Sequence, residues 1–296
     1  MDWIYDFPTM DPERLRAVKK AIDTGFRAFT RAWGEDIERL FDPLKAFLIW
    51  SDALLTRSPW PLVLLAVAVV VWFASRSWKL VAGSLLALFV IGYLDMWKAT
   101  METVSMILVA TVVAIVVGIP VGIAMARFDR LRAVVVPVLD VMQTMPSFVY
   151  LIPVVMLLGI GKVPGLIAVV IYAIPPVIRL TDLGIRLVDR EILEAADAFG
   201  SSGWQKLKNV QIPLALPTIM AGINQTIMMA LAMVVVAAMI GVQGLGQPVL
   251  KAIASQYFTL GVFNGFAIVG VAIIFDRTTQ AFGRRLQKHR EAAHGL

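Results

Sequence analysis

Long apolar runs, separated by short charged stretches, dominate the chain from residue 58 onward. A run of about 18 or more apolar residues is typical of a membrane-spanning helix, because the hydrocarbon core of a bilayer is about 30 Å thick. Charged residues mark where each run stops. The pattern predicts seven spans, of which the first two are short, at residues 58–75, 80–94, 103–126, 133–161, 163–178, 214–240 and 258–275.

Residues 1–57 show a different periodicity. Apolar side chains recur at spacings of three and four from Leu15 to Trp33, and charged side chains occupy much of the remainder. A second apolar stripe follows Gly34 and is interrupted by Pro43. The pattern predicts one or two amphipathic helices that lie on the membrane or against the protein, as an anchor or in a regulatory or scaffolding role. Residues 1–30 contain no apolar h-region and so do not indicate a signal peptide.

The composition supports a polytopic α-helical membrane protein. Of the 296 residues, 59% are hydrophobic and 16% are charged, whereas about a quarter of the residues are charged in a soluble domain. The net charge of +6 comes from basic residues that flank the spans, which indicates lipid headgroups and not nucleic acid as the partner. Basic residues concentrate after spans one, three and five and in the C-terminal tail. The positive-inside rule therefore places the C-terminus in the cytoplasm and, with seven spans, the N-terminal tail in the periplasm.

The chain lacks the residues of several kinds of catalytic and metal site. It has no cysteine, and its two histidines, His289 and His294, lie in the polar C-terminal tail, so no metal site is expected. No buried histidine or paired acids on neighbouring spans indicate an intramembrane enzyme. The P-loop pattern is absent as well, so we expect this chain to bind no nucleotide or other cofactor and not to be an enzyme.

The charged stretch at residues 188–213, between spans five and six, is the most structured loop that the sequence predicts. Gly200 stands where a left-handed helix C-cap is expected. Ser202 and Gln205 have the spacing of a capping box that starts a second short helix. Because the loop is cytoplasmic in the predicted topology, its apolar helical face is expected to meet a soluble partner. That face consists of Val188, Ile192, Ala195, Ala196 and Phe199.

Two segments of this loop, EAADAFG at residues 194–200 and VQIP at residues 210–213, resemble the EAA loop of ABC-importer permeases. The family pattern is EAA, three residues, G, nine residues, I, one residue, LP. Val210 and Ile212 depart from it by replacing the usual Ile and Leu. The resemblance implies that the loop couples the chain mechanically to an ATPase and is neither catalytic nor substrate-binding. The residues assigned to this coupling are Glu194, Ala195, Ala196, Phe199, Gly200 and Pro213.

Three further segments, MQTMPSFVYLIPVVMLLGIG, IYAIPPVIRLTDLGI and MVVVAAMIGVQGLGQPVL, resemble the glycine betaine/proline betaine permeases of the ProW type. The resemblance implies an all-α integral membrane protein with the five-helix core of the type I (MetI-like) importer permeases. The implied organisation is an amphipathic tail at residues 1–57, two accessory transmembrane helices at 58–98, the permease core at 99–285 and a cytoplasmic tail at 286–296.

This family implies a permease subunit of a bacterial inner-membrane importer for osmoprotective solutes such as glycine betaine and proline betaine. Its implied partners are a second copy of the chain, two cytoplasmic ABC ATPase subunits that hold ATP and Mg²⁺, and a periplasmic substrate-binding protein. One alternative is the same machinery importing choline, histidine or another small cationic or zwitterionic solute. The other is an ATP-independent solute channel.

Polar and aromatic residues within the spans are candidates for the translocation path, because polar groups at membrane depth tend to face a cavity or a neighbouring helix. Interhelical hydrogen bonding and core packing are the alternatives. Aromatic rings attract quaternary ammonium groups such as that of a betaine by cation–π interaction. The candidate path residues are Asp140, Gln143, Thr144, Pro146, Phe148, Tyr172, Asn224 and Gln225.

Glycine and proline positions predict where the helices approach closely or break. Gly118 and Gly122 form a G-x-x-x-G pattern, which favours close helix packing. The glycine-rich residues 241–246 predict an extracellular turn or a partly re-entrant loop. Spans four and five are expected to kink or break at their prolines, which are Pro146, Pro153, Pro175 and Pro176.

Overall fold

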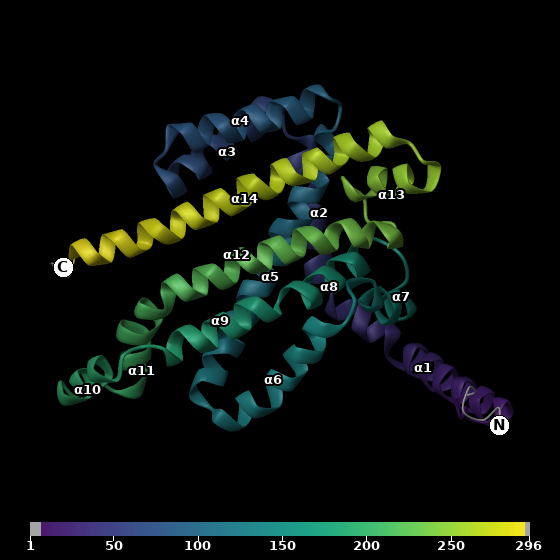
Figure 1. Cartoon of the computed structure of the whole chain (residues 1–296), viewed down its shortest axis with the longest axis horizontal. Coiled ribbons are helices and arrows are strands. Elements are labelled where there is room, and N and C mark those ends of the chain that lie inside the picture. The colour runs from purple at the N-terminus through teal and green to yellow at the C-terminus, as the bar shows by residue number, and fades with distance from the viewer. Residues whose placement is uncertain (1–6, 294–296) are drawn as a thin grey trace.

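The computed structural model describes residues 7–293, with side chains as far as residue 286, and the described part contains helices and no strands (Figure 1). In chain order the helices are α1 (Pro12–Leu40), α2 (Asp42–Arg57), α3 (Trp60–Ser75), α4 (Trp78–Tyr93), α5 (Trp97–Arg127), α6 (Asp129–Thr144), η2 (Ser147–Tyr150), α7 (Leu151–Leu158), α8 (Lys162–Ala173), α9 (Pro175–Arg186), α10 (Arg190–Ala198), α11 (Gly203–Lys206), η3 (Leu207–Gln211), α12 (Ile212–Ala237), η4 (Ala238–Ile240), α13 (Gly246–Ser255) and α14 (Phe258–Ala293).

Six of the seven predicted spans fall on one helix or on helices that continue one another, and span four falls on two segments that meet at a bend. Spans three, six and seven lie in α5, α12 and α14, and span five lies in α8 and α9, which continue as one 25-residue helix. These four helices are long and apolar enough to cross a membrane. Spans one and two correspond to α3 and α4, which have 16 residues each and are shorter than a typical span. By length and composition the described residues hold four spans, or up to six if each of two bent helix pairs counts as one span, so the predicted number of seven is not confirmed. Span five is interrupted at Ile174, directly before Pro175 and Pro176, as the proline pattern predicted, but the two parts continue as one span.

Span four is not the single continuous helix that residues 133–161 suggested. It consists of α6 and the η2–α7 segment, which meet at an angle of 112°. The break lies at Pro146, as the proline pattern predicted, and the preceding residue, Met145, has extended backbone angles. A proline cannot donate the helical N–H bond, and its ring disfavours a helical conformation in the residue before it. Pro153 lies in the first turn of α7 and does not break that helix.

Helix α9 lies between α5 and α12 and packs closely against both. A Cβ atom added at Gly122 on α5 would lie 2.6 Å from Thr181 Cβ and 2.7 Å from the Ile178 carbonyl oxygen. One added at Gly222 on α12 would lie 3.0 Å from Leu180 Cβ. The G-x-x-x-G pattern on α5 therefore serves close helix packing, as expected, and α9 is held on two sides by glycine faces.

The two N-terminal helices differ in their surroundings. Helix α1 has no buried residue and continues through Gly34. It ends before Phe41, which separates it from α2. Helix α2 packs against α5, where Leu48 is only 2% exposed and the hydroxyl groups of Ser51 and Ser105 are 3.0 Å apart. Of the two placements that the sequence left open for the amphipathic region, α2 takes the one against the protein.

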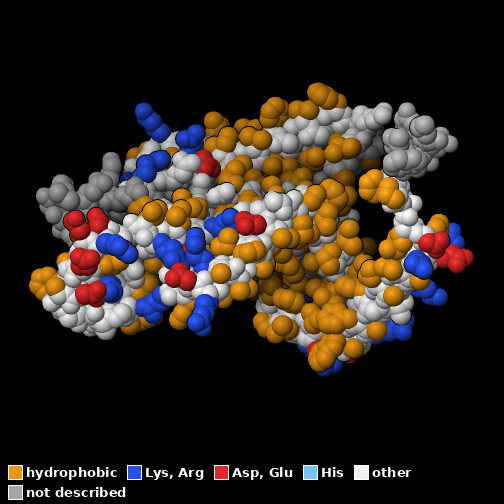
Figure 2. Space-filling view, turned by 60° about the horizontal axis from the view of Figure 1, so that its bottom comes forward, with side chains coloured by type: hydrophobic (Ala, Val, Ile, Leu, Met, Phe, Trp, Pro, Cys, Tyr) orange, Lys and Arg blue, Asp and Glu red, His pale blue; other side chains and the backbone are white. Residues whose placement is uncertain are grey.

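The two ends of the molecule differ in what they display. Helices α10 and α11 and the C-terminal part of α14 lie at one end, and the N-terminus lies at the other (Figure 1). In the space-filling view, hydrophobic side chains cover the middle of the visible face, and charged side chains gather toward the ends (Figure 2). This distribution fits a molecule whose middle faces lipid and whose ends face water.

Candidate functional site

The loop between spans five and six folds as its local sequence predicts. The side chain of Asp189 caps α10 by accepting a hydrogen bond from the N–H of Glu191 at 3.0 Å. Gly200 ends the helix with a φ of +75°, in the left-handed region that a glycine occupies without strain. Ser202 and Gln205 form the predicted capping box at the start of α11. The loop is therefore an ordered pair of short helices.

One arginine from outside the loop anchors it to the bundle. The guanidinium of Arg127, at the end of α5, donates to the carbonyl oxygen of Gly203 at 2.6 Å and lies 6.0 Å from the centre of the Trp204 ring. Within the loop, the Lys206 amine lies 2.6 Å from a carboxylate oxygen of Asp197 and so ties α11 to α10. These contacts fix how α10 is presented at the tip of the molecule.

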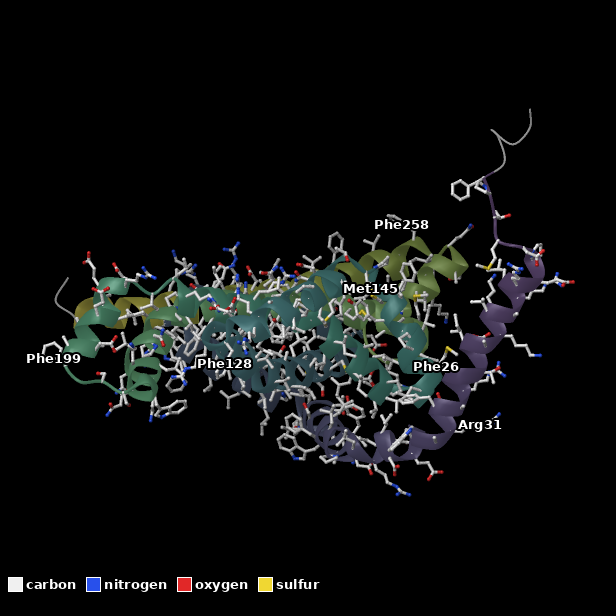
Figure 3. All side chains as sticks on the ribbon, turned by 90° about the horizontal axis from the view of Figure 1, so that it is seen from below. Phe26, Arg31, Phe128, Met145, Phe199 and Phe258 are labelled. Carbon is white, nitrogen blue, oxygen red and sulfur yellow. The ribbon has the colours of Figure 1, made fainter. Side chains whose placement is uncertain are left out.

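Helix α10 and the adjoining Phe199 present an apolar surface that no side chain among residues 7–286 covers. Phe199 is 91% exposed and Ile192 is 43% exposed, and Figure 3 shows Phe199 at the extreme end of the molecule. Glu194 and Ala195 are also exposed, and Ala196 is partly exposed. Val188, the first residue of the predicted face, is instead buried in the bundle. Apart from Val188, the residues assigned to the apolar face are thus accessible at the surface.

A network of arginines and aspartates lies at the same end, where α5, α6 and α9 meet. Asp182 on α9, whose side chain is 7% exposed, accepts hydrogen bonds from Arg132 at 3.0 Å and from Arg186 at 2.8 Å. Arg186 also reaches Asp129 at 2.7 Å and the carbonyl oxygen of Met125 at 2.8 Å. Sequence analysis missed this network. The spacing of Asp182 and Arg186, one turn apart on a helix, was the available signal.

The candidate path residues of span four lie on and beside the bend. Asp140 on α6 forms an ion pair with Arg179 on α9. Gln143 and Thr144 are exposed on the last turn of α6, and the Thr144 hydroxyl donates to the carbonyl oxygen of Val141 at 3.1 Å. The break beside them interrupts the helical backbone hydrogen bonds. At membrane depth, such a break has to be surrounded by protein or by a water-filled cavity, and not by lipid.

Beyond the break, the aromatic candidates fall into two environments. Pro146 and Phe148 are exposed, Phe148 by 55%. Tyr172 packs edge-on against the buried Tyr150, with ring centres 5.8 Å apart. The Tyr150 hydroxyl donates to the carbonyl oxygen of Met142, so this ring connects the two sides of the bend. Tyr172 therefore takes part in core packing, the alternative that the sequence left open for the aromatic residues.

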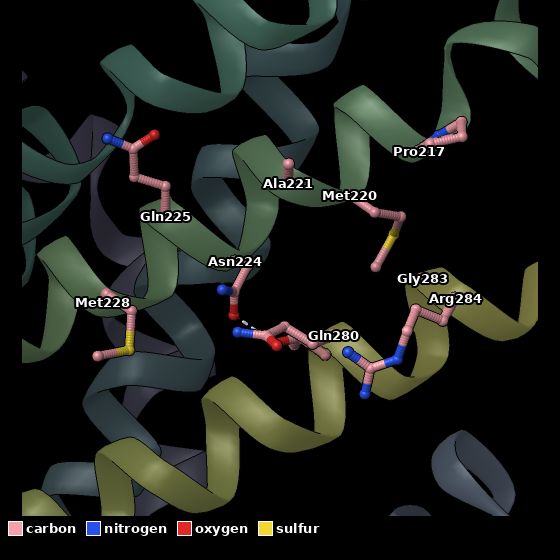
Figure 4. A pocket seen from close by; sticks show the side chains of 10 residues that line it. Pro217, Met220, Ala221, Asn224, Gln225, Met228, Gln280, Gly283 and Arg284 are labelled. Carbon is pink, nitrogen blue, oxygen red and sulfur yellow. Dashed lines mark hydrogen bonds between the residues drawn. The ribbon is translucent and has the colours of Figure 1, made fainter. Parts of the chain in front are cut away.

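The polar pair on α12 borders a cavity of about 490 Å³ between α12 and α14. Asn224 points toward α14 (Figure 4), where its amide donates to Asp276 at 2.9 Å and accepts from the Thr279 hydroxyl. Gln280 also donates to Asp276, at 2.6 Å. Asn224 thus makes interhelical hydrogen bonds. Gln225 borders the same cavity with its amide directed away from α14 (Figure 4).

The candidate path residues do not form one cluster within a single chain. The structure describes no hydrogen bond or ion pair between the α6 group, Asp140 to Thr144, and the α12 pair, Asn224 and Gln225. Sequence analysis also missed Asp276, the acceptor that holds Asn224. Its only signal was its position as the single acidic residue near the end of the last span.

At the opposite end, the glycine-rich segment after α12 folds back onto the bundle. Val242 and Leu245 are buried, and the Leu245 N–H donates to the Thr103 hydroxyl at 2.9 Å. Gly244 has a φ of +133°, and a Cβ there would lie 2.5 Å from that same hydroxyl oxygen. The segment is therefore an ordered turn that packs against the bundle; whether it re-enters the membrane, as one of the two predicted forms has it, stays a prediction.

Known proteins resemble this chain in sequence and in fold. The family model described as "Binding-protein-dependent transport system inner membrane component" matches residues 118–288. The glycine betaine/carnitine transport permease protein GbuB of Listeria monocytogenes is 48% identical over 229 residues, which are 77% of this chain and 81% of that protein. The glycine betaine/proline betaine transport system permease protein ProW of Escherichia coli is 47% identical over 242 residues, which are 82% of this chain and 68% of that protein.

The fold also matches a solved structure. An inward-facing conformation of the MetNI methionine ABC transporter matches with a TM-score of 0.57 at 19% identity, over 62% of this chain and 93% of the matched chain. At that identity the likeness concerns the fold alone. Together with the family match and the two relatives, it identifies the chain as a multi-pass permease that belongs to the family of inner-membrane components of binding-protein-dependent transport systems.

Proposed function

We propose that this permease imports glycine betaine, proline betaine or a closely similar methylated-nitrogen solute, driven by ATP hydrolysis on a separate protein. The names of the relatives support this substrate class. Three are named as permeases for glycine betaine, one of them also for carnitine and another also for proline betaine, and a fourth is named as a permease for trimethylamine N-oxide. The last of these, from Ruegeria pomeroyi, is 35% identical over 91% of this chain. These solutes share a small polar body and a quaternary or fully substituted nitrogen.

The observation that carries the coupling to ATP is the exposed surface of α10. Ile192 and Phe199 expose apolar surface together at this tip, by 43% and 91%, and an exposed apolar patch indicates an interaction site. The partner we propose is a cytoplasmic ABC ATPase, with one copy under each of two permease chains in a homodimer. ATP and Mg²⁺ are held by that ATPase, and Glu194, Ala195, Ala196, Phe199, Gly200 and Pro213 are assigned to its docking and to the transmission of its movement.

The connections of α10 suggest how movement reaches the membrane. Helix α9 leads into α10, and α11 continues through η3 into α12. Because α9 and α12 pack against each other through Gly184 and Gly222, a displacement of the loop acts on both helices together. The path candidates Asp140, Gln143, Thr144, Pro146, Phe148, Tyr172, Asn224 and Gln225 lie on these helices or on the helices beside them. In a dimer, two such sets would face one path.

The positive-inside pattern supports a cytoplasmic C-terminus and a periplasmic N-terminal tail. The fold agrees with this orientation, because α10 and the C-terminus lie at one end of the molecule and the N-terminus lies at the other (Figure 1). The periplasmic end, which includes the glycine-rich turn at residues 241–246, is where a substrate-binding protein would deliver its ligand. The side chains of His289 and His294 lie outside the described residues.

The test is uptake of radiolabelled glycine betaine into proteoliposomes that contain the permease, its ATPase and its binding protein, with ATP inside. The matched variants are Gly200→Asn and Gly200→Val. No atom lies within 4 Å of a Cβ at this position, so only backbone strain at a φ of +75° separates them. Asparagine tolerates this conformation, whereas a β-branched residue costs about 1–2 kcal/mol there.

We expect uptake that requires both ATP and the binding protein, that is retained in Gly200→Asn and that is reduced several-fold in Gly200→Val. Uptake of choline but not of glycine betaine would support an ATP-driven importer and contradict the proposed substrate. Uptake without ATP and without partners would contradict the proposal and favour a channel.

A further inference from the structure

A basic pocket of about 480 Å³ lies where the loop between α3 and α4 meets the C-terminal part of α14. Its lining includes Ser75, Arg76 and Ser77 from the loop and Arg284 and Arg285 from α14. About two hundred residues of sequence separate the two sides, so the fold, and not a local run of basic residues, brings these arginines together. No residue of the coupling loop and none of the candidate path residues lines this pocket. Arg284 also borders the neighbouring cavity between α12 and α14.

The positive charge of the basic pocket is not balanced by an ion pair within the part of the chain whose side chains the structure describes. Among the side chains that the structure describes, no carboxylate lies within 4.0 Å of the guanidinium of Arg76, Arg284 or Arg285 in an ion pair. Arg285 donates to the carbonyl oxygen of Phe73. Guanidinium groups that share one pocket repel one another, and an anion between them would turn that repulsion into attraction.

The backbone beside the pocket adds to the same charge preference. Helix α4 begins at Trp78, and its N-cap residue, Ser77, makes no capping hydrogen bond through its side chain. The first N–H groups of a helix have no partner within the helix, and this end carries a partial positive charge. The beginning of α4 therefore reinforces the arginines in favouring an anion.

Aromatic residues place the basic pocket at the depth of the lipid headgroups. Trp72 and Trp78 flank the loop with ring centres 4.2 Å apart, and Arg76 lies 5.8 Å from the centre of the Trp72 ring. Trp60 and Trp97 lie at the other end of the α3–α4 hairpin. Tryptophan is enriched at both membrane–water interfaces. The surface of α3 and α4 between these aromatic pairs exposes large apolar side chains, among them Leu62, Leu65, Val70, Leu86, Phe89 and Val90.

We propose that the basic pocket binds the phosphate of an anionic phospholipid headgroup. Arg76 and Arg284 hold the phosphate from its two sides, and the acyl chains lie along the apolar surface of the hairpin. Bound in this way, the lipid links the α3–α4 hairpin to α14, a helix of the family-matched region. The α3–α4 loop and the C-terminal part of α14, which line the pocket, lie toward the same end as α10 (Figure 1), and in the predicted topology this is the cytoplasmic leaflet.

The test measures lipid binding to the purified full chain in detergent by native mass spectrometry. Phosphatidylglycerol, phosphatidylcholine and inorganic phosphate are titrated separately. The variants are Arg76→Gln and Arg284→Gln, and the matched control is Lys79→Gln, which removes one positive charge from an exposed residue close to the loop that is not part of the pocket lining. A thermal melt of each variant in the same detergent checks that it is folded.

We expect phosphatidylglycerol to bind more tightly than phosphatidylcholine, and each arginine variant to weaken its binding about five-fold, which corresponds to one lost basic contact near a membrane surface. Lys79→Gln should change the affinity less than two-fold. An equal effect of all three variants would show a diffuse basic surface and overturn the proposal. So would equal binding of the two lipids, or binding of inorganic phosphate that displaces the lipid.

Discussion

The exposed ring of Phe199 permits a quantitative prediction for the coupling loop. The ring is 91% exposed, so nearly its whole apolar surface is available to be buried against the ATPase. Burying a phenylalanine side chain contributes about 1.5–3 kcal/mol relative to leaving it in water. Since each 1.4 kcal/mol is a factor of ten in affinity, Phe199→Ala is expected to weaken ATPase binding about 10- to 150-fold.

The same substitution should leave the permease itself unchanged. A side chain that is almost fully exposed contributes little to the folded state, so the free energy of unfolding should change by less than about 0.5 kcal/mol. The matched control is Phe7→Ala, which removes an 86% exposed ring near the N-terminal end of α1, at the opposite end of the molecule. This control should alter neither ATPase binding nor stability.

The measurement is a titration of detergent-solubilised permease with its purified ATPase, together with a thermal melt of the permease alone. An affinity of Phe199→Ala within two-fold of the wild type would refute the assignment of α10 as the docking surface. Equal loss in Phe199→Ala and Phe7→Ala would refute it as well, because a general effect on an exposed aromatic ring would then explain the result.

Two further predictions concern the core. Gly122→Ala is expected to cost about 1–3 kcal/mol of stability, because its Cβ would meet backbone and side-chain atoms of α9 at less than 3 Å. Gly265→Ala, where no atom lies within 4 Å, should be neutral or stabilising in the same thermal melt; equal melting points would contradict the close packing of α5 and α9. Asp276→Leu is expected to cost about 1–3 kcal/mol, because it removes the acceptor of the Asn224 and Gln280 amides. Asp276→Asn, which keeps an acceptor oxygen, should lose less, and an equal loss in both variants would show that those hydrogen bonds are not what stabilises the pair of helices.

The local features of the chain were predictable because each depends on neighbouring residues. The apolar runs located the helical segments of each predicted span, since a helix satisfies its own backbone hydrogen bonds wherever lipid surrounds it. The C-cap at Gly200, the capping box of Ser202 and Gln205 and the break at Pro146 followed from the conformational preferences of single residues or short spacings. The motif at residues 194–213 was readable for the same reason.

The tertiary structure decided everything that depends on pairs of residues far apart in the chain. The 112° bend of span four and the burial of α2 against α5 arise from packing, which no local pattern encodes. The partners of Asp182, of Asn224 and of the three arginines in the basic pocket lie up to about two hundred positions away. A polar or charged side chain in the sequence shows only that a partner is needed, because burying such a group without one is costly. Which residue becomes that partner is determined by how the helices pack.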